Sequence, residues 1–223
     1  MKILALETSG DYCSVALWRD GIIEDREIPA GQRQSGLLLD LVHELLLSCD
    51  MRLADVDGIA FGAGPGSFTG LRVACGVVQG LAMGADKPVV GVNTLQALAE
   101  SADARRVVCC VDARMSEVYQ AAYEKRGDEW STVQEAGVYG PDDVPALPGD
   151  GWHGCGSGFA AYRDALRTRY GSALGSIDDT GHAGARDVAN LAAPVFARGG
   201  GLNAELAAPF YVRDKVALKT HER

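Results

Sequence analysis

Acidic side chains stand at the ends of two strand-like runs of the sequence. Glu7 and Asp112 each follow a short apolar run, and Asp11 and Glu117 lie a few residues further along the chain. Two carboxylates that face one cleft could hold a Mg²⁺–nucleotide, because Mg²⁺ takes oxygen ligands together with substrate phosphates. The alternative is that these acids are solvated turn residues at sheet edges. The turn Ala113–Ser116 contains bulky side chains, whereas a loop that cradles phosphate needs small residues.

The segment Gly62–Arg72, with the sequence GAGPGSFTGLR, lies between a predicted strand and a predicted helix. Backbone N–H groups at such a position can hold an anion. The segment is not a P-loop, because no Gly-Lys-Ser/Thr follows, and Ser67 replaces the third glycine of a dinucleotide fingerprint. The alternative is a tight turn in which Ser67 is the N-cap of the helix.

Neither a metal centre nor a nucleophile is predicted. Zinc needs clustered ligands, and the histidines are scattered. The cysteines form no C-x-x-C pair, and the sequence has no G-x-S-x-G or H-E-x-x-H motif. We therefore predict no catalytic residue, metal ligand or cofactor, and we expect the thiols to be reduced and buried. The histidines concerned are His43, His153, His182 and His221.

Two predicted helices near the N-terminus have unusual faces. Apolar residues of the first, within Leu37–Ser48, cover an arc of roughly 200° at 100° per residue, which is wider than one sheet face can bury. The second has glycines at a spacing of four, which form a smooth face that another helix can approach closely. We predict a partner interface here, and the alternative is that the two helices pack on each other. The interface residues would be Leu38, Leu41, Val42, Leu45, Gly76, Gly80 and Gly84.

The elements that must position these residues follow a repeated order. Three strand-like runs joined by short turns predict an antiparallel meander at Lys2–Glu7, Tyr12–Trp18 and Ile22–Ile28. Helices and strands then alternate: a helix from about Ser35 to Ser48, a strand at Gly58–Phe61, a helix from Phe68 to about Gly84, a strand at Lys87–Val92 and a helix at Thr94–Ala102.

The run Val107–Asp112 restarts this pattern, and strand-like runs follow at Glu117–Tyr123 and Thr132–Val138. Gly151–Gly158 predicts a strand-to-helix turn, and further helices are predicted near Phe159–Arg169 and Ala185–Arg198. This weak similarity, at a period of roughly a hundred residues, predicts an α/β fold of two related halves, each with a mixed sheet flanked by helices. We place the halves at residues 1–102 and 103–223, with the tail after about residue 202 packing back on the first.

Composition narrows the class of protein. The chain has 223 residues with 21 Lys and Arg against 30 Asp and Glu, a net charge of −9. This negative net charge argues against a chain that binds nucleic acid without a partner protein. We expect no membrane-spanning helix and no signal peptide, because apolar runs are short and Glu7 interrupts the N-terminal one. The cysteine pattern favours the cytoplasm.

Four segments together resemble the TsaB (YeaZ) family. They are the N-terminal run Ile3–Ser9, the string Gly64–Arg72, the turn region Asp112–Tyr119 and the C-terminal Pro209–Arg213. The resemblance spans essentially the whole chain. It implies two actin-like (ASKHA, RNase H-like) domains, which fits the predicted repeat.

The resemblance also implies a role in making threonylcarbamoyladenosine in tRNAs that read codons starting with A. In that system the paralogue TsaD transfers threonylcarbamoyl from its adenylate to tRNA, TsaB is its non-catalytic partner, and the ATPase TsaE joins them. TsaD carries a His-x-x-x-His metal motif, and the matching stretch here, Asn93–Ala97, has no histidine.

We therefore expect a non-enzymatic subunit that binds TsaD directly through a helical bundle, contacts tRNA only indirectly, and forms a homodimer when alone. One alternative is a catalytic ASKHA ATPase or kinase that uses Glu7, Asp11 and Asp112. A remote alternative is a glycoprotease-like peptidase.

Overall fold

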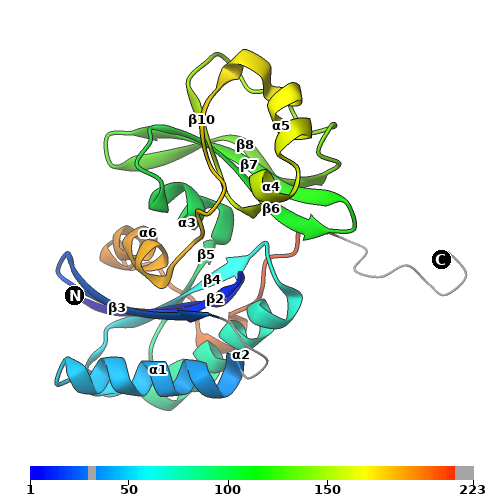
Figure 1. Ribbon diagram of the computed structural model, residues 1–223. Coiled ribbons are helices and arrows are strands. Elements are labelled where there is room, and N and C mark those ends of the chain that lie inside the picture. The colour runs from blue at the N-terminus through cyan, green and yellow to red at the C-terminus, as the bar shows by residue number, and fades with distance from the viewer. Residues whose placement is uncertain (30–33, 214–223) are drawn as a thin grey trace, which may run out of the picture.

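A computed structural model describes residues 1–29 and 34–213 of the chain. The first half of the chain forms a five-stranded sheet in the order β3-β2-β1-β4-β5 (Figure 1). The first three strands form the predicted antiparallel meander, and β4 and β5 add to β1 in parallel. The strands are β1 (Lys2–Glu7), β2 (Tyr12–Arg19), β3 (Ile22–Pro29), β4 (Gly58–Gly64) and β5 (Val89–Asn93).

The second half repeats this topology in a sheet of order β10-β9-β6-β7-β8. Strands β6, β7 and β8 form an antiparallel meander, and β9 and β10 add to β6 in parallel. The predicted α/β fold with two related mixed sheets is thereby confirmed. The strands are β6 (Arg106–Arg114), β7 (Glu117–Arg126), β8 (Glu129–Tyr139), β9 (Trp152–Cys155) and β10 (Leu174–Asp178).

Six α-helices in the described residues cover these sheets. Helix α2 begins where the Ser67 side chain accepts a hydrogen bond from the Gly70 N–H, and it ends at Asp86 in a left-handed conformation. The predicted helix Phe159–Arg169 is divided into two at Tyr162, and strand β10 was not predicted. The helices are α1 (Gln34–Ser48), α2 (Phe68–Ala85), α3 (Thr94–Ser101), α4 (Ser157–Ala161), α5 (Arg163–Tyr170) and α6 (Ala185–Ala197).

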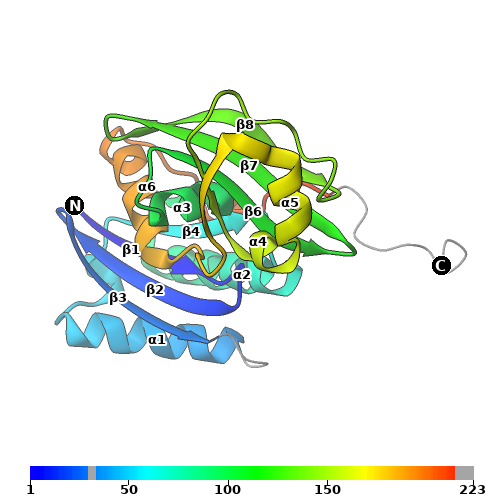
Figure 2. The ribbon, with the colours of Figure 1, turned by 45° about the horizontal axis from the view of Figure 1, so that its top comes forward.

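The first sheet is covered on both faces. Helices α1 and α2 pack on the face that carries Leu4 and Leu6 of β1, and α6 packs on the opposite face with Ile3 and Ala5. Helix α3 packs on the second sheet, so α3 and α6 lie between the two sheets (Figures 1 and 2). A helix far along the chain thus completes the first core, and the proposed division at residue 102 stays a prediction.

Helix α2 is long and apolar enough, with 18 residues, to cross a bilayer by length and composition alone. In the structure its apolar residues Leu71, Ala74, Cys75, Val78 and Ala82 are buried. Core helices commonly pass the same test of length and composition, so this feature is weak support for a membrane span.

Candidate functional site

The glycine-rich segment packs tightly against the turn between β1 and β2. A Cβ atom on Gly70 would lie 1.9 Å from the carbonyl oxygen of Thr8, and one on Gly66 would lie 2.7 Å from Ser9. Only glycine leaves room for these backbone approaches. The glycines of the segment therefore serve the chain's own packing.

Backbone N–H groups of the same segment are used within the chain. The Ser67 N–H donates to the Ser9 carbonyl at 2.7 Å, and the Gly64 N–H donates to Thr94 Oγ1 at 3.1 Å. The Gly70 N–H donates to Ser67 Oγ at 3.3 Å, so the predicted N-cap is present. A cradle for phosphate needs such donors free, and these three are already satisfied.

Glu7, at the end of β1, is buried instead of solvated. Its Oε1 accepts a hydrogen bond from the Ser9 N–H at 2.5 Å, while Oε2 has no partner. Burial raises the pKa of this carboxyl, and hydrogen bonds from Ser9 and Thr8 only partly oppose the shift. A Cβ on Gly62 would lie 1.7 Å from Oε2, so a glycine is needed beside it. A raised pKa disfavours the charged carboxylate that a metal–nucleotide would need.

The acids of the second half are engaged by basic side chains. Asp112 pairs with Arg114 at 3.0 Å and accepts the Arg114 N–H at 2.8 Å. Arg114, Met115 and Ser116 all have positive φ, at 61°, 55° and 60°. Side chains in this left-handed region crowd the backbone, so the turn stores strain that its contacts must offset.

The tail joins the two halves of the molecule. The Phe210 N–H donates to the Ala63 carbonyl at 2.6 Å, beside the glycine-rich segment, and the Tyr211 hydroxyl accepts from Arg72 Nε at 3.2 Å. Two residues later Arg213 forms an ion pair with Glu117 of β7. The tail therefore links the loop after β4 to the strained turn between β6 and β7.

No group of three or more His, Cys, Asp or Glu side chains that could hold a metal ion occurs within residues 1–29 and 34–213. Of the two acids in the first half, Asp11 is exposed and Glu7 is buried. The strand-end acids thus lie in different environments, and those of the second half already have cationic partners.

The structure divides the predicted interface residues into two sets. Gly76, Gly80 and Gly84 are exposed on α2, and nothing lies within 4 Å of a Cβ placed on any of them. The apolar residues of α1 belong to the core of the first half, and their contribution to a partner interface stays a prediction. These buried residues are Leu38, Leu41, Val42 and Leu45.

Other apolar side chains of the two helices remain exposed. Leu39 and Leu47 of α1 are 48% and 64% exposed, and Met83 of α2 is 68% exposed. Both helices lie on the outer face of the first sheet (Figure 1). We define the outer helical face as Leu39, Leu47, Gly76, Gly80, Met83 and Gly84. At 100° per residue Leu47 falls outside the apolar arc of α1, so its exposure could be read from the sequence, whereas no such pattern singles out Met83.

Comparison with known proteins identifies the family. The chain is 36% identical over 233 residues to the tRNA threonylcarbamoyladenosine biosynthesis protein TsaB of Escherichia coli (strain K12), which covers 98% of this chain and 97% of that protein. The chain belongs to the TsaB family. The protein of the same name from Haemophilus influenzae is 39% identical over 175 residues, 73% of this chain and 74% of that one.

Structures and a wider family agree with this membership. The structure described as YeaZ from Pseudomonas aeruginosa has a TM-score of 0.87 and 38% identity, over 94% of this chain and 99% of that one. Residues 29–153 also match the family described as TsaD, tRNA N6-adenosine threonylcarbamoyltransferase. The two mixed sheets of this TsaB family member are therefore two actin-like domains, and the chain is involved in tRNA threonylcarbamoyladenosine biosynthesis.

Proposed function

We propose that this chain is the non-catalytic partner subunit of TsaD in threonylcarbamoyl transfer to the adenosine next to the anticodon, in a machinery that TsaE joins. The observation that carries the proposal is the outer helical face, because its three glycines on α2 have open space around them and apolar side chains of α1 and α2 are exposed. A stripe without side chains lets a partner helix approach closely, and adjoining apolar surface supplies the hydrophobic contact. The matching helix pair of TsaD is the proposed occupant, and a second copy of this chain would replace it when TsaD is absent.

A non-catalytic role is supported by the state of the strand-end acids and the glycine-rich segment. Three donors of that segment are satisfied within the chain, Glu7 is buried with a raised pKa, and Asp112 is paired with Arg114. These are the groups on which an ATPase or kinase would depend. We also propose a cytoplasmic location, in keeping with the free and mostly buried cysteines.

Copurification with TsaD tests the interface. Leu47→Glu and Gly80→Trp change exposed positions, so the fold should survive while binding of TsaD is lost. Leu38→Glu and Val42→Glu are less informative, because they place a charge in the core. Ile22→Glu is the matched control, since Ile22 is 68% exposed on β3 and lies outside the outer helical face. Retention of TsaD by both test variants would refute this interface.

Reconstitution of tRNA modification tests the role. TsaD with TsaE should be inactive without this chain and active with it, and activity without it would overturn the required-subunit proposal. Calorimetry with Mg-ATP separates this proposal from a catalytic ATPase or kinase. We expect no tight binding by the isolated chain, and tight binding that Glu7→Gln and Asp112→Asn abolish would favour the enzyme.

A further inference from the structure

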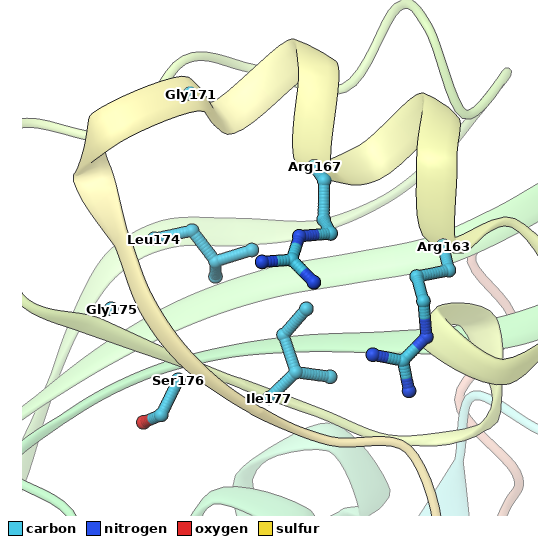
Figure 3. A pocket seen from close by; sticks show the side chains of 7 residues that line it. All are labelled: Arg163, Arg167, Gly171, Leu174, Gly175, Ser176 and Ile177. Atoms are coloured by element: carbon cyan, nitrogen blue, oxygen red, sulfur yellow. The ribbon is translucent and has the colours of Figure 1, made fainter.

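A cavity of about 300 Å³ opens between helix α5 and strand β10 in the second half of the chain. Its walls are α5, the short 3-10 turn Gly171–Ala173 and β10. Figure 3 shows Arg163 and Arg167 reaching from α5 toward the strand. Two guanidinium groups on successive turns of one helix therefore line the same hollow.

Of the two arginines that line this cavity, Arg163 forms an ion pair and Arg167 forms none with the described residues. None of the residues that line it is acidic. Arg163 pairs with Asp179, which occupies Nη2 of its guanidinium. Among the ion pairs that the described residues form, none involves Arg167. A guanidinium has five N–H donors, so Arg163 and Arg167 together retain many donors for an anion.

The strand side of the cavity is shaped by a bulge. The pairing of β10 with β9 shifts between Leu174 and Ser176, so Gly175 is left outside the regular register. Bulges of this kind are common at sheet edges and binding sites, where they redirect a strand. Ser176, which also lines the cavity, has its Oγ 2.8 Å from His153 Nδ1. Aliphatic wall residues Leu174 and Ile177 leave the arginines as the only charged lining groups.

We propose that Arg163 and Arg167 form a binding site for a phosphate group in this cavity. The planar guanidinium matches phosphate oxygens with paired N–H donors, and two of them in a concave site recognise one dianionic or diester group. The phosphate could come from the backbone of tRNA or from a free nucleotide. Helices α1 and α2 lie at the other end of the molecule, so a ligand here would not compete with a partner on the outer helical face (Figure 1).

Titration of the full isolated chain with inorganic phosphate tests the site without TsaD, so its outcome is independent of the proposed function. In NMR spectra, phosphate should shift the amide signals of Gly171, Gly175 and Ser176. Arg167→Ala should abolish these shifts, whereas the control Arg198→Ala should retain them, because it removes the same charge from an exposed position outside the cavity. Absence of shifts in the wild type, or shifts that survive Arg167→Ala, would overturn the proposal.

Two further arms identify the source of the phosphate. The tRNA source rests on the proposed function, so it is measured as tRNA binding to the complex with TsaD over a range of salt concentrations. Loss of one phosphate contact in Arg167→Ala should reduce the salt slope of log affinity by about one, and Arg198→Ala should not. If ADP instead displaces inorganic phosphate and the slope is unchanged, the source is a nucleotide. If Arg167→Ala alters neither tRNA nor ADP binding, the site has no biological phosphate ligand and the proposal fails.

Discussion

The two halves of the molecule share one sheet topology but differ in the layer outside the sheet. Between β3 and β4 the first half has helix α1, whereas the corresponding segment between β8 and β9, residues 140–151, contains only turns and bends. Helix α2 runs unbroken over 18 residues, while its counterpart is divided into α4 and α5. The duplicated sheet is thus a common framework, and the outer helices make the halves different.

The two halves also differ in the side chains that fill their cores and in those that they leave exposed. A buried cluster in the second half contains large aromatic side chains, including Trp152, Phe159 and Tyr170. The first half leaves Leu39 and Leu47 exposed on α1 and Met83 exposed on α2, where three glycines are exposed as well. Exposed apolar side chains of this kind are the basis of the proposed TsaD interface, and the second half has an arginine-lined cavity.

The largest expected effect is on the free energy of unfolding, and it tests whether the buried leucines of α1 stabilise the first half. Leu45→Ala should lower the free energy of unfolding by roughly 2–5 kcal/mol, because Leu45 is fully buried and its loss leaves a cavity. Leu47→Ala, two residues away and 64% exposed, should change it by less than about 0.5 kcal/mol. Chemical denaturation measures both, and equal losses would show that the two leucines do not differ in burial.

The next prediction compares alanine substitutions at two glycines of α2, which should change the free energy of unfolding in opposite directions. Gly70→Ala forces a Cβ against the Thr8 carbonyl oxygen and should destabilise the chain by roughly 1–3 kcal/mol. Gly80→Ala meets open space in a helix interior and should stabilise the chain by roughly 0.5–1 kcal/mol. If Gly80 is needed for close approach of a partner, the same variant should weaken TsaD binding. Thermal unfolding and a binding assay together decide the matter, and a stabilised variant with unchanged binding would argue against the glycine stripe.

A smaller effect concerns the strand-end acid of the first half. Since the pKa of Glu7 is raised in the folded state, its contribution to stability is complete below its unfolded pKa and is lost as pH rises through the folded value. Glu7→Gln should therefore be more stable than wild type at pH 7 to 8, and the difference should shrink toward pH 4. Urea titrations across this range test it with Glu44→Gln, an exposed acid of α1, as the control. A difference that does not vary with pH would refute the assignment.

The smallest effect concerns the link between the halves. Arg213→Ala removes a partly exposed ion pair with Glu117 and should cost only about 0.2–1 kcal/mol. Its local effect should be larger, because the strained turn Arg114–Ser116 loses a neighbouring contact. Hydrogen exchange should become faster at this turn and stay unchanged in the first sheet, and unchanged exchange at the turn would show that the tail does not restrain it.

Much of the first half was predictable because its signals are local. Alternating apolar residues with short turns predicted β1 to β3 at nearly their observed bounds, and Ser67 with its following apolar run predicted the start of α2. The signals in the second half are weaker. Strand β10 has the sequence LGSID, whose glycine forms a bulge at a sheet edge, and no Pro or Gly marks the break at Tyr162.

For the candidate site, the sequence predicted which residues to consider but not whether their side chains are buried, paired or exposed. Sequence reasoning named Glu7 and Asp112 as equivalent strand-end acids, yet one is buried without a partner for Oε2 and the other is paired with Arg114. It named Leu38 and Gly80 as members of one interface, yet one lies in the core and the other on the surface. Burial depends on what packs against a side chain, and the periodicity of one helix does not contain that information.

The sequence by itself determined most elements of the first half, the repeat and the family, because periodicity, turn chemistry and motif spacing are properties of neighbouring residues. Only the tertiary structure decided that α6 covers the first sheet, that the tail joins the two halves, and that Arg163 and Arg167 face a common cavity. Each of these depends on contacts between segments distant in the chain, where burial, packing and the pairing of charges are settled together.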